Sequence, residues 1–226
     1  QAQADFAEKR YCVIDNILEE RYIKALYKEV PKMPYGVWGC VRNDHNKYPA
    51  GFQNSEKFPG VLQGHIEEGR GNFSYFHYAY WLLKEKHKAH NDPRVTEFNR
   101  VVTEDYSILE PEYTFHDLVS EVTGFTNMFT NQPTYSYYDH TAWLNAHHDP
   151  QRWCAYIFYF NETWLTQWGG QLCILDKDEK TIKHSIEPFG NRLLIMDVSE
   201  LSGKRINKHF ISPVSITADN PRYSLA

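Results

Sequence analysis

The sequence predicts a mainly β domain, with helices packed on one outer face of a double-sheet jelly roll or barrel. Aromatic residues make up 15% of the chain, which exceeds the usual content of a helical bundle and suits β-rich packing around a pocket. From residue 126 onward, short runs rich in Tyr, Phe, Ile, Val and Trp are separated by Gly, Asn, Asp and Pro. Such closely spaced runs are typical of strands in this class of fold.

The length of 226 residues fits one domain with a sizeable core. We therefore expect a single domain over residues 1–226, in which a helix- and loop-rich first half, 1–125, precedes a jelly-roll core, 126–226. The strands expected in the second half are 126–130, 133–138, 142–147, 153–160, 171–176, 182–187, 191–197, 206–214 and 222–226.

The first half begins with an expected strand at 11–15 and an amphipathic helix that follows it to about residue 30, with Asp15 or Asn16 as its N-cap. Residues 35–73 contain many glycines and prolines, so we expect long loops there, of the kind that often form lids. Further helices are expected at 75–87, after the pair Asp92-Pro93, and at 114–122 before Gly124.

Composition excludes several partners. The formal charge of −5 argues against nucleic acid, because that affinity rests largely on clustered Lys and Arg. No apolar run approaches the roughly 18 residues of a membrane span, and residues 1–10 lack the features of a signal peptide. The cysteines, which are Cys12, Cys40, Cys154 and Cys173, are scattered, so we expect reduced core thiols in a cytoplasmic protein without a membrane partner.

A metal site is indicated by the run Asn145-Ala-His147-His148-Asp149-Pro150 at the end of an expected strand. Residues two apart on a strand point to the same side, so His147 and Asp149 would face one pocket and His148 the opposite face. His209, on a later strand-like segment, supplies a third ligand. Two imidazoles and one carboxylate leave three positions open on an octahedral ion, as in non-haem iron(II) oxygenases.

Arg222 lies on the next expected strand after His209. Its guanidinium could bind a carboxylate through two parallel hydrogen bonds if it enters the same pocket. The alternative is an ordinary surface arginine. A His-x-Asp pair alone is a weak indication of a metal site. The pattern becomes specific because His209 and Arg222 follow it in this order.

Over residues 138–226 the sequence resembles the prolyl-hydroxylase-like branch of the 2-oxoglutarate and iron(II)-dependent dioxygenases. The features that carry this resemblance are Tyr138, His147-x-Asp149, Tyr159-Phe-Asn161, Trp164, Gly169-Gly170-Gln-Leu172, Ile186-Glu-Pro188, Asn191-Arg-Leu-Leu194, His209 with Pro213-Val214, and Arg222-Tyr-Ser. The stretch 152–172 is particularly similar to that of oxygen-sensing prolyl hydroxylases. The resemblance implies a double-stranded β-helix, a cupin-like jelly roll with the metal at its open mouth.

Residue by residue, the resemblance implies that His147, Asp149 and His209 bind iron and that Arg222 pairs with the distal carboxylate of 2-oxoglutarate. Tyr138 and Tyr159 match tyrosines that help to hold this cosubstrate, and Tyr137 competes with Tyr138 because the spacing before His-x-Asp varies among relatives. Packing in the aromatic core is the alternative for each tyrosine.

The activity that the resemblance implies is hydroxylation of an unactivated C–H bond, with Fe(II), 2-oxoglutarate and O2 required and ascorbate as a supporting reductant. Succinate and CO2 are released. Asp149 favours this outcome, because halogenating relatives carry a small residue at that position.

The substrate is expected to be a small molecule, such as an amino acid or a biosynthetic intermediate. Charged loop residues, namely Arg42, Glu67, Glu68 and Arg70, could bind an amino acid. Thr141 stands where many relatives have Gly, and the segment before residue 125 gives no clear alignment to protein-directed prolyl hydroxylases. A peptide or protein substrate, modified at proline or another residue, is the second hypothesis. A jelly-roll binding module without turnover is the third, and the oligomeric state is left open.

Overall fold

The computed structural model describes residues 1–33, 39–42, 73–79, 93, 114–127, 134–149, 152–201 and 204–226. Within these ranges the helices are α1 (Ala2–Lys9), α2 (Glu20–Glu29) and α6 (Phe115–Thr123), with 3-10 turns η1 (Val30–Lys32) and η5 (Thr166–Trp168). The strands are β1 (Tyr11–Asp15), β2 (Gly39–Arg42), β3 (Phe73–Ala79), β4 (Thr134–Tyr138), β5 (Trp143–His147), β6 (Cys154–Tyr159), β7 (Leu172–Leu175), β8 (Ile182–Ile186), β9 (Arg192–Asp197), β10 (Glu200–Leu201), β11 (Lys204–Arg205), β12 (His209–Ile211) and β13 (Arg222–Leu225).

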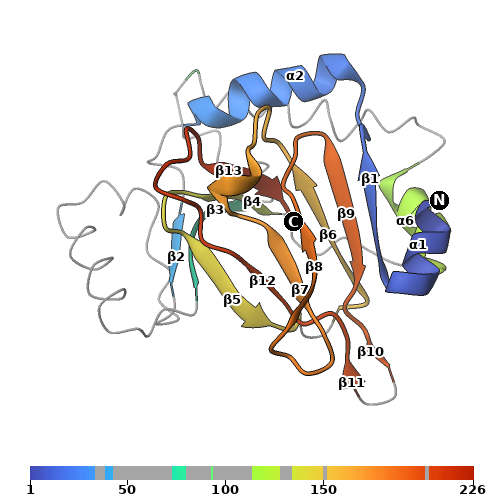
Figure 1. Cartoon of the computed structure of the whole chain (residues 1–226). Coiled ribbons are helices and arrows are strands. Elements are labelled where there is room, and N and C mark those ends of the chain that lie inside the picture. Colours follow the sequence, from blue (N-terminus) through green and yellow to red (C-terminus); the bar gives the residue numbers. More distant parts are fainter. Residues whose placement is uncertain are drawn as a thin grey trace.

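Eleven of the described strands form one antiparallel sheet with the order β1-β9-β6-β13-β4-β3-β5-β12-β7-β8, to which β2 is added beside β3, and β10 and β11 pair separately (Figure 1). The two ends of this path face each other across a shared core. Residues from β6 and β9, such as Tyr159 and Leu194, are buried in one cluster with Leu172 and Ile174 from β7. The fold is therefore the expected double-stranded β-helix with packed helices.

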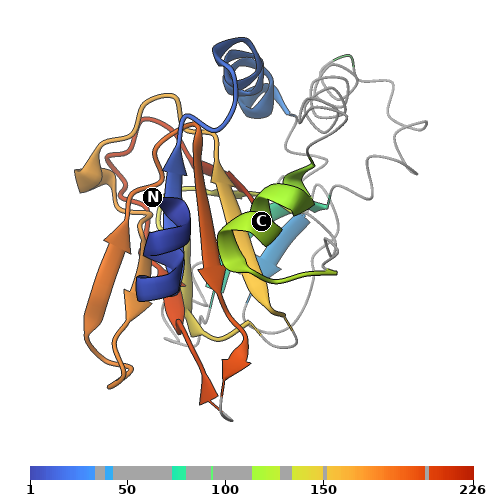
Figure 2. The same ribbon diagram turned by 90° about the vertical axis from the view of Figure 1, so that its right-hand side faces the viewer.

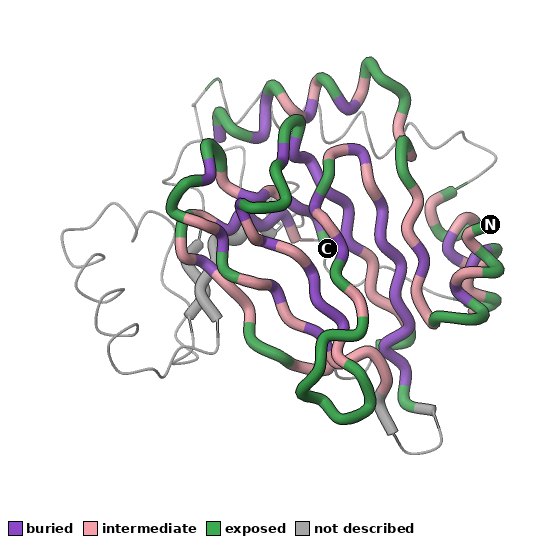
Figure 3. The backbone as a smooth tube through the Cα atoms, in the orientation of Figure 1, coloured by how far each residue is buried: buried purple, intermediate pink, exposed green. Residues whose placement is uncertain are grey.

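The apolar runs of β6 and β9 are buried on both faces. Along β9, Leu194 and Met196 point into the core between the two halves of the sheet. Leu193 and Ile195 point the other way, into a cluster that also contains Phe6 of α1, Leu26 of α2 and Val119 of α6. Side chains alternate along a strand, so covering both faces requires the continuous apolar run Leu193–Met196. Figure 2 shows α1 and α6 lying over this face, as expected for the helices, and Figure 3 shows the run of buried residues along β9.

Helix α6 has clear local signals at both ends. The Thr114 side chain accepts a hydrogen bond from the Asp117 backbone N–H, and the Asp117 carboxylate accepts one from the Thr114 backbone N–H. This capping box satisfies two N–H groups of the first turn. At the other end Gly124 adopts a left-handed φ of 74° and donates its N–H to the Ser120 carbonyl. The expected helix at 114–122 is thus confirmed.

Eight of the nine strands expected in the second half are present, with shifted ends. The first, at 126–130, is described only at residues 126 and 127, which are not in a strand. Helix α1 and the short ribbon β10–β11 were not expected. The expectation of reduced thiols holds for Cys12, Cys154 and Cys173, which are free cysteines. None of the described helices has the length and apolarity to cross a membrane.

The helix expected at 75–87 is wrong over its first residues, because β3 occupies Phe73–Ala79 and pairs with β4 and β5. The run Phe-Ser-Tyr-Phe-His-Tyr-Ala is rich in aromatic residues that favour strands, and its pairing outweighs the local helical pattern. Its remainder, residues 80–87, lies outside the described residues, as does the helix after Asp92-Pro93 apart from Pro93 itself, which is helical. Within the expected loops at 35–73, β2 is a strand.

The N-cap expected for the amphipathic helix after β1, which is α2, is also wrong. Helix α2 begins at Glu20, with Glu19 as its N-cap. Asn16 has a left-handed φ of 57°, and the next residues are held by Asn191, whose side-chain amide bonds both the N–H and the C=O of Leu18 at 2.8 Å. These two hydrogen bonds from a residue far along the chain hold Leu18 outside the helix, so α2 begins only at Glu20. The local sequence pattern gives no sign of them.

Candidate metal centre and cosubstrate site

His147 and His209 lie directly opposite each other on neighbouring antiparallel strands. His147 ends β5, His209 begins β12, and their Cα atoms are register partners. The imidazole centroids are 4.4 Å apart. On its other side His209 is paired with Ile174 of β7, so the ladder fixes the histidine on both edges.

Both imidazoles make the same local hydrogen bond. The Nδ1 atom of His147 lies 2.8 Å from the carbonyl oxygen of Asn145, and the Nδ1 atom of His209 lies 2.8 Å from that of Asn207. A carbonyl oxygen only accepts, so each Nδ1 carries the proton and each Nε2 keeps its lone pair. This is the usual arrangement for a histidine that binds a metal through Nε2.

Asp149 follows β5 and turns its carboxylate toward both imidazoles. Its Oδ1 lies 3.9 Å from Nε2 of His147, and its Oδ2 lies 3.7 Å from Nε2 of His209. One ligand atom from each of the three residues falls within 4.8 Å of the others. Two neutral nitrogens and one carboxylate oxygen suit Fe(II) and leave coordination positions open, so the donor set fits this ion.

His209 is the deepest of the three residues, with 4% of its surface exposed. Burial, together with the neighbouring His147, lowers the pKa of His209 to about 4, while the Asp149 carboxylate opposes this shift. His209 is therefore neutral at physiological pH, as metal binding requires.

Arg222, on β13, is completely buried. Its Nη1 donates to the hydroxyl of Ser224 at 3.1 Å, whereas Nε and Nη2 have no hydrogen-bond partner among the described residues. A buried guanidinium without an anion is costly. Two nitrogens of a planar fork that still lack acceptors fit a ligand carboxylate, such as that of 2-oxoglutarate.

Tyr138 and Tyr159 flank this arginine. Strand β13 runs between β4 and β6, with Arg222 opposite Tyr138 and Ser224 opposite Tyr159. The Arg222 Cζ atom lies 4.7 Å from the Tyr138 ring centroid and 5.0 Å from that of Tyr159. The Tyr159 hydroxyl is buried without a hydrogen-bond partner among the described residues. Burial raises the pKa of Tyr159, with Arg222 acting in the opposite direction.

Tyr137, the competitor of Tyr138, points to the other face of β4. It belongs to the cluster beneath the helices, and its ring lies 5.9 Å from that of Tyr223. The arrangement around Arg222 therefore favours Tyr138.

The lack of a side chain at Gly170 leaves space for the side chain of Arg222. This glycine has a left-handed φ of 69°, and a Cβ atom there would lie 3.0 Å from Cδ of Arg222 and 3.1 Å from Cζ2 of Trp164. Two residues later β7 begins and pairs with β12, the strand that carries His209. The segment from Gly170 to β7 therefore joins the surroundings of Arg222 to the strand that pairs with His209.

His148 points away from the three clustered residues, as expected, and its Nε2 lies 3.6 Å from Glu179. The half-exposed Arg152 lies 3.8 Å from Oδ1 of Asp149, a neighbour that residue types alone did not single out. The loop residues considered for substrate binding, which are Arg42, Glu67, Glu68 and Arg70, have side chains outside the described part of the chain.

The 2OG-Fe(II) oxygenase superfamily model matches residues 126–226, the part that carries His147, Asp149, His209, Arg222, Tyr138 and Tyr159. Among curated protein sequences, none matches the chain significantly. Solved structures are similar over nearly the whole chain. A prolyl hydroxylase from Trichoplax adhaerens, in complex with a peptide of the hypoxia inducible factor oxygen degradation domain, has a TM-score of 0.62 at 16% identity, covering 99% of this chain and 84% of that one.

Two further structures share the fold. A prolyl-4-hydroxylase from Pseudomonas putida has a TM-score of 0.52 at 14% identity and covers 99% and 94% of the two chains. An oxidoreductase of the 2OG-Fe(II) oxygenase family from Burkholderia pseudomallei has a TM-score of 0.55 at 9% identity and covers 99% and 86%. At such identities these likenesses concern the fold alone.

Residues 126–226 thus match the 2OG-Fe(II) oxygenase superfamily, and the described strands form a double-stranded β-helix. The match and the clustered His147, Asp149 and His209 indicate a dioxygenase that uses Fe(II), 2-oxoglutarate and O2, and the fold is like that of prolyl hydroxylases.

Proposed function

We propose that this chain hydroxylates an unactivated C–H bond of a small molecule, with His147, Asp149 and His209 as the iron ligands and Arg222 as the anchor of 2-oxoglutarate. The observation that carries the ligand set is the proximity of three possible ligand atoms, one from each residue, all within 4.8 Å of one another. The protons on both Nδ1 atoms leave the two Nε2 lone pairs available for the ion.

The assignment of Arg222 rests on its two buried nitrogens that lack acceptors among the described residues. The distal carboxylate of 2-oxoglutarate would accept from both of them, and the Tyr159 hydroxyl would donate to the same carboxylate. Tyr138 would support the guanidinium with its ring face. These residues would orient the cosubstrate and exclude water from it.

When bound, Fe(II) supports the reaction of O2 with 2-oxoglutarate, in which one oxygen atom enters succinate, CO2 leaves and the other atom enters the substrate. The chain contributes a neutral His209 at physiological pH and a carboxylate at Asp149. A ligand set with a carboxylate supports hydroxylation.

A second substrate class, a prolyl or other residue of a peptide, is favoured by one observation. The solved structure with a TM-score of 0.62 contains a bound peptide. The small-molecule proposal rests on the N-terminal part of the chain, whose sequence gives no clear alignment to protein-directed enzymes and lies outside the family match. A small substrate needs a site that closes over it, whereas a peptide needs an open groove.

The test is succinate formation by the iron-loaded enzyme under labelled O2, first with a metabolite extract and then with a set of proline-containing peptides. A labelled small product, heavier by one oxygen atom, supports the main proposal, and a labelled peptide supports the second. If neither labelled product nor succinate is formed, the result would favour a binding module without turnover. His209→Ala is expected to abolish succinate formation, and retained activity would refute the ligand set. Arg222→Met is expected to raise the KM for 2-oxoglutarate at least tenfold, since it removes the anion partner.

A further inference from the structure

The geometry points to Asn207 as the positioning residue of His209, an inference that rests on the proposed function of His209 as an iron ligand. Asn207 stands two residues before His209 and outside any strand, with a left-handed φ of 52°. Its backbone carbonyl is the acceptor for Nδ1 of His209 at 2.8 Å. The direction of this carbonyl therefore determines where the Nε2 lone pair of His209 points.

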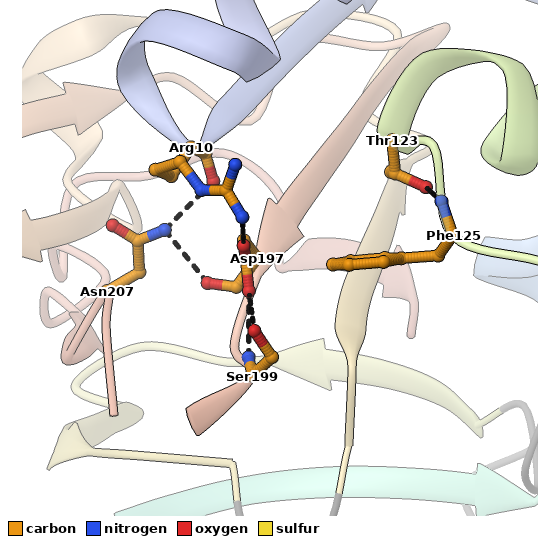
Figure 4. Close-up of polar contacts among 6 residues, drawn as sticks. All are labelled: Arg10, Thr123, Phe125, Asp197, Ser199 and Asn207. Atoms are coloured by element: carbon orange, nitrogen blue, oxygen red, sulfur yellow. Dashed lines mark hydrogen bonds and ion pairs between the residues drawn. The ribbon is translucent and has the colours of Figure 1, made fainter. Parts of the chain in front are cut away.

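The side chain of Asn207 holds its own backbone in place. Its Nδ2 atom donates to the carbonyl oxygen of Arg10 and to that of Asp197, both at 2.9 Å (Figure 4). Both amide hydrogens are thus used on backbone acceptors from two distant segments. The bond to Asp197 also closes the base of the β10–β11 ribbon, which lies between these residues in the chain.

The two acceptors are themselves fixed. The Arg10 carbonyl accepts a second hydrogen bond, from the backbone N–H of Asp197 at 2.9 Å, and the Arg10 guanidinium pairs with the Asp197 carboxylate. That carboxylate is completely buried and also accepts from the backbone N–H and the hydroxyl of Ser199, at 2.8 Å and 2.6 Å. Figure 4 shows this arrangement between the end of α1 and the end of β9. Asn207 is therefore bound to a hydrogen-bonded platform that consists of Arg10, Asp197 and Ser199.

His147 does not need such a device. The acceptor for its Nδ1 is the carbonyl of Asn145, which also stands two residues earlier. Asn145 lies inside β5, between Leu144, which pairs with β3, and His147, which pairs with His209, so paired residues on both sides orient its carbonyl although the β5–β12 register shifts there. Asn207 precedes its strand and has no ladder to do so, and its side-chain amide replaces the ladder. The two Asn-x-His segments thus reach the same imidazole geometry by different means.

A change at Asn207 should alter metal affinity, because the partner of a ligand's second nitrogen sets its tautomer and orientation, and loss of such partners typically weakens metal binding by about 10–100-fold. The platform also includes Arg10, so the N-terminal segment contributes to metal affinity although it supplies no ligand.

The test is Asn207→Gly, which retains the freedom to adopt a left-handed φ but removes both amide hydrogen bonds. The matched control is Asn191→Gly. Asn191 also has a left-handed φ, of 56°, and its amide also makes two hydrogen bonds, both to Leu18, but it does not touch a proposed ligand. Affinity for Co(II), used as the probe, is measured by titration of metal-free protein, with thermal unfolding of each variant as a measure of stability.

Asn207→Gly is expected to weaken Co(II) affinity roughly tenfold or more, whereas Asn191→Gly changes it by less than about threefold at a similar loss of stability. Equal effects of the two variants, or an unchanged affinity in Asn207→Gly, would overturn the inference. Should Asn207→Gly fail to fold, Asn207→Asp takes its place, since it keeps the shape but presents an acceptor to both carbonyls, and the same loss of affinity is expected.

His209→Ala separates this inference from the proposed function. If His209→Ala keeps the Co(II) affinity of the wild type, the ligand set fails. If His209→Ala loses the affinity but Asn207→Gly keeps it, only the role of Asn207 fails. A second readout is the exchange of the His209 Nδ1–H proton with water in the Co(II) protein, observed by proton NMR. Asn207→Gly should accelerate this exchange, and an unchanged rate would contradict the positioning role.

Discussion

Gly170 lies against the side chain of Arg222, and a Cβ atom at Gly170 would come within 3.0 Å of Arg222 Cδ. Gly170→Ala should therefore displace the guanidinium by a few tenths of an ångström and raise the KM for 2-oxoglutarate roughly tenfold, a loss of about 1.4 kcal/mol in binding. The left-handed φ at this position should also cost about 1–2 kcal/mol of stability. Steady-state kinetics and chemical denaturation measure the two effects.

Gly124→Ala is the matched control for this prediction. Gly124 has a similar φ of 74°, but a Cβ there would meet nothing within 4 Å. It should lose a similar amount of stability with no change in the KM for 2-oxoglutarate. Equal KM values in both variants would show that the contact with Arg222 does not affect the cosubstrate.

Tyr159→Phe distinguishes cosubstrate binding from core packing. The Tyr159 hydroxyl is buried and lacks a partner among the described residues, so its removal should leave the melting temperature unchanged or raise it. If the hydroxyl donates to 2-oxoglutarate, the KM for this cosubstrate should rise about fivefold or more, equivalent to roughly 1 kcal/mol. A lower melting temperature with an unchanged KM would instead assign the hydroxyl to the core.

His147→Ala and His148→Ala form a pair of neighbouring substitutions with opposite expectations. His147 points toward Asp149 and His209, whereas His148 points toward Glu179. His147→Ala should abolish stoichiometric Fe(II) binding, and His148→Ala should leave it within about threefold, since His148 contacts Glu179 and is not one of the three clustered residues. Metal content after anaerobic loading measures both, and the reverse pattern would move the ligand to His148.

The low pKa of His209 predicts that acid destabilises the metal-free protein. The unfolded chain protonates this histidine near its ordinary pKa of 6.5, but the folded chain does so only near 4. The neutral form therefore stabilises the fold fully above pH 6.5, and this contribution is lost as the pH falls toward 4. It amounts to something on the order of 3 kcal/mol.

Chemical denaturation of metal-free wild type and His209→Gln between pH 4 and pH 7 tests this expectation. The variant should lose less unfolding free energy over the interval, because Gln does not titrate. Parallel losses in the two proteins would contradict it.

Much of the candidate site could be predicted from short-range periodicity. The period of two along a strand placed His147 and Asp149 on one side and His148 on the other, and the structure has this arrangement. The approach of Tyr159 to Arg222 was expected only through resemblance, since their strands become neighbours through long-range pairing.

What the sequence concealed depends on tertiary contacts. The helix predicted from residue 75 is wrong there because the partners of β3, which are β4 and β5, follow it by many residues. The late start of α2 depends on Asn191, and the orientation of His209 depends on Asn207 and Arg10. Each of these asparagines has a left-handed φ and bonds a backbone far away in sequence. An asparagine next to a strand indicates a left-handed backbone conformation, but it does not indicate which distant backbone group its side chain binds.

Among the described strands, β1 pairs with β9 alone, with Tyr11 opposite Met196. During synthesis on the ribosome, β1 therefore cannot form this pairing until β9, about 180 residues later, has been translated. The same holds for Arg10, whose partners Asp197 and Asn207 are also made late. Such distant pairing slows folding and leaves apolar residues of β1 waiting in solution. His209 lies on β12, which also follows β9 in the chain, so the three clustered residues His147, Asp149 and His209 can come together only after residue 209 has been translated.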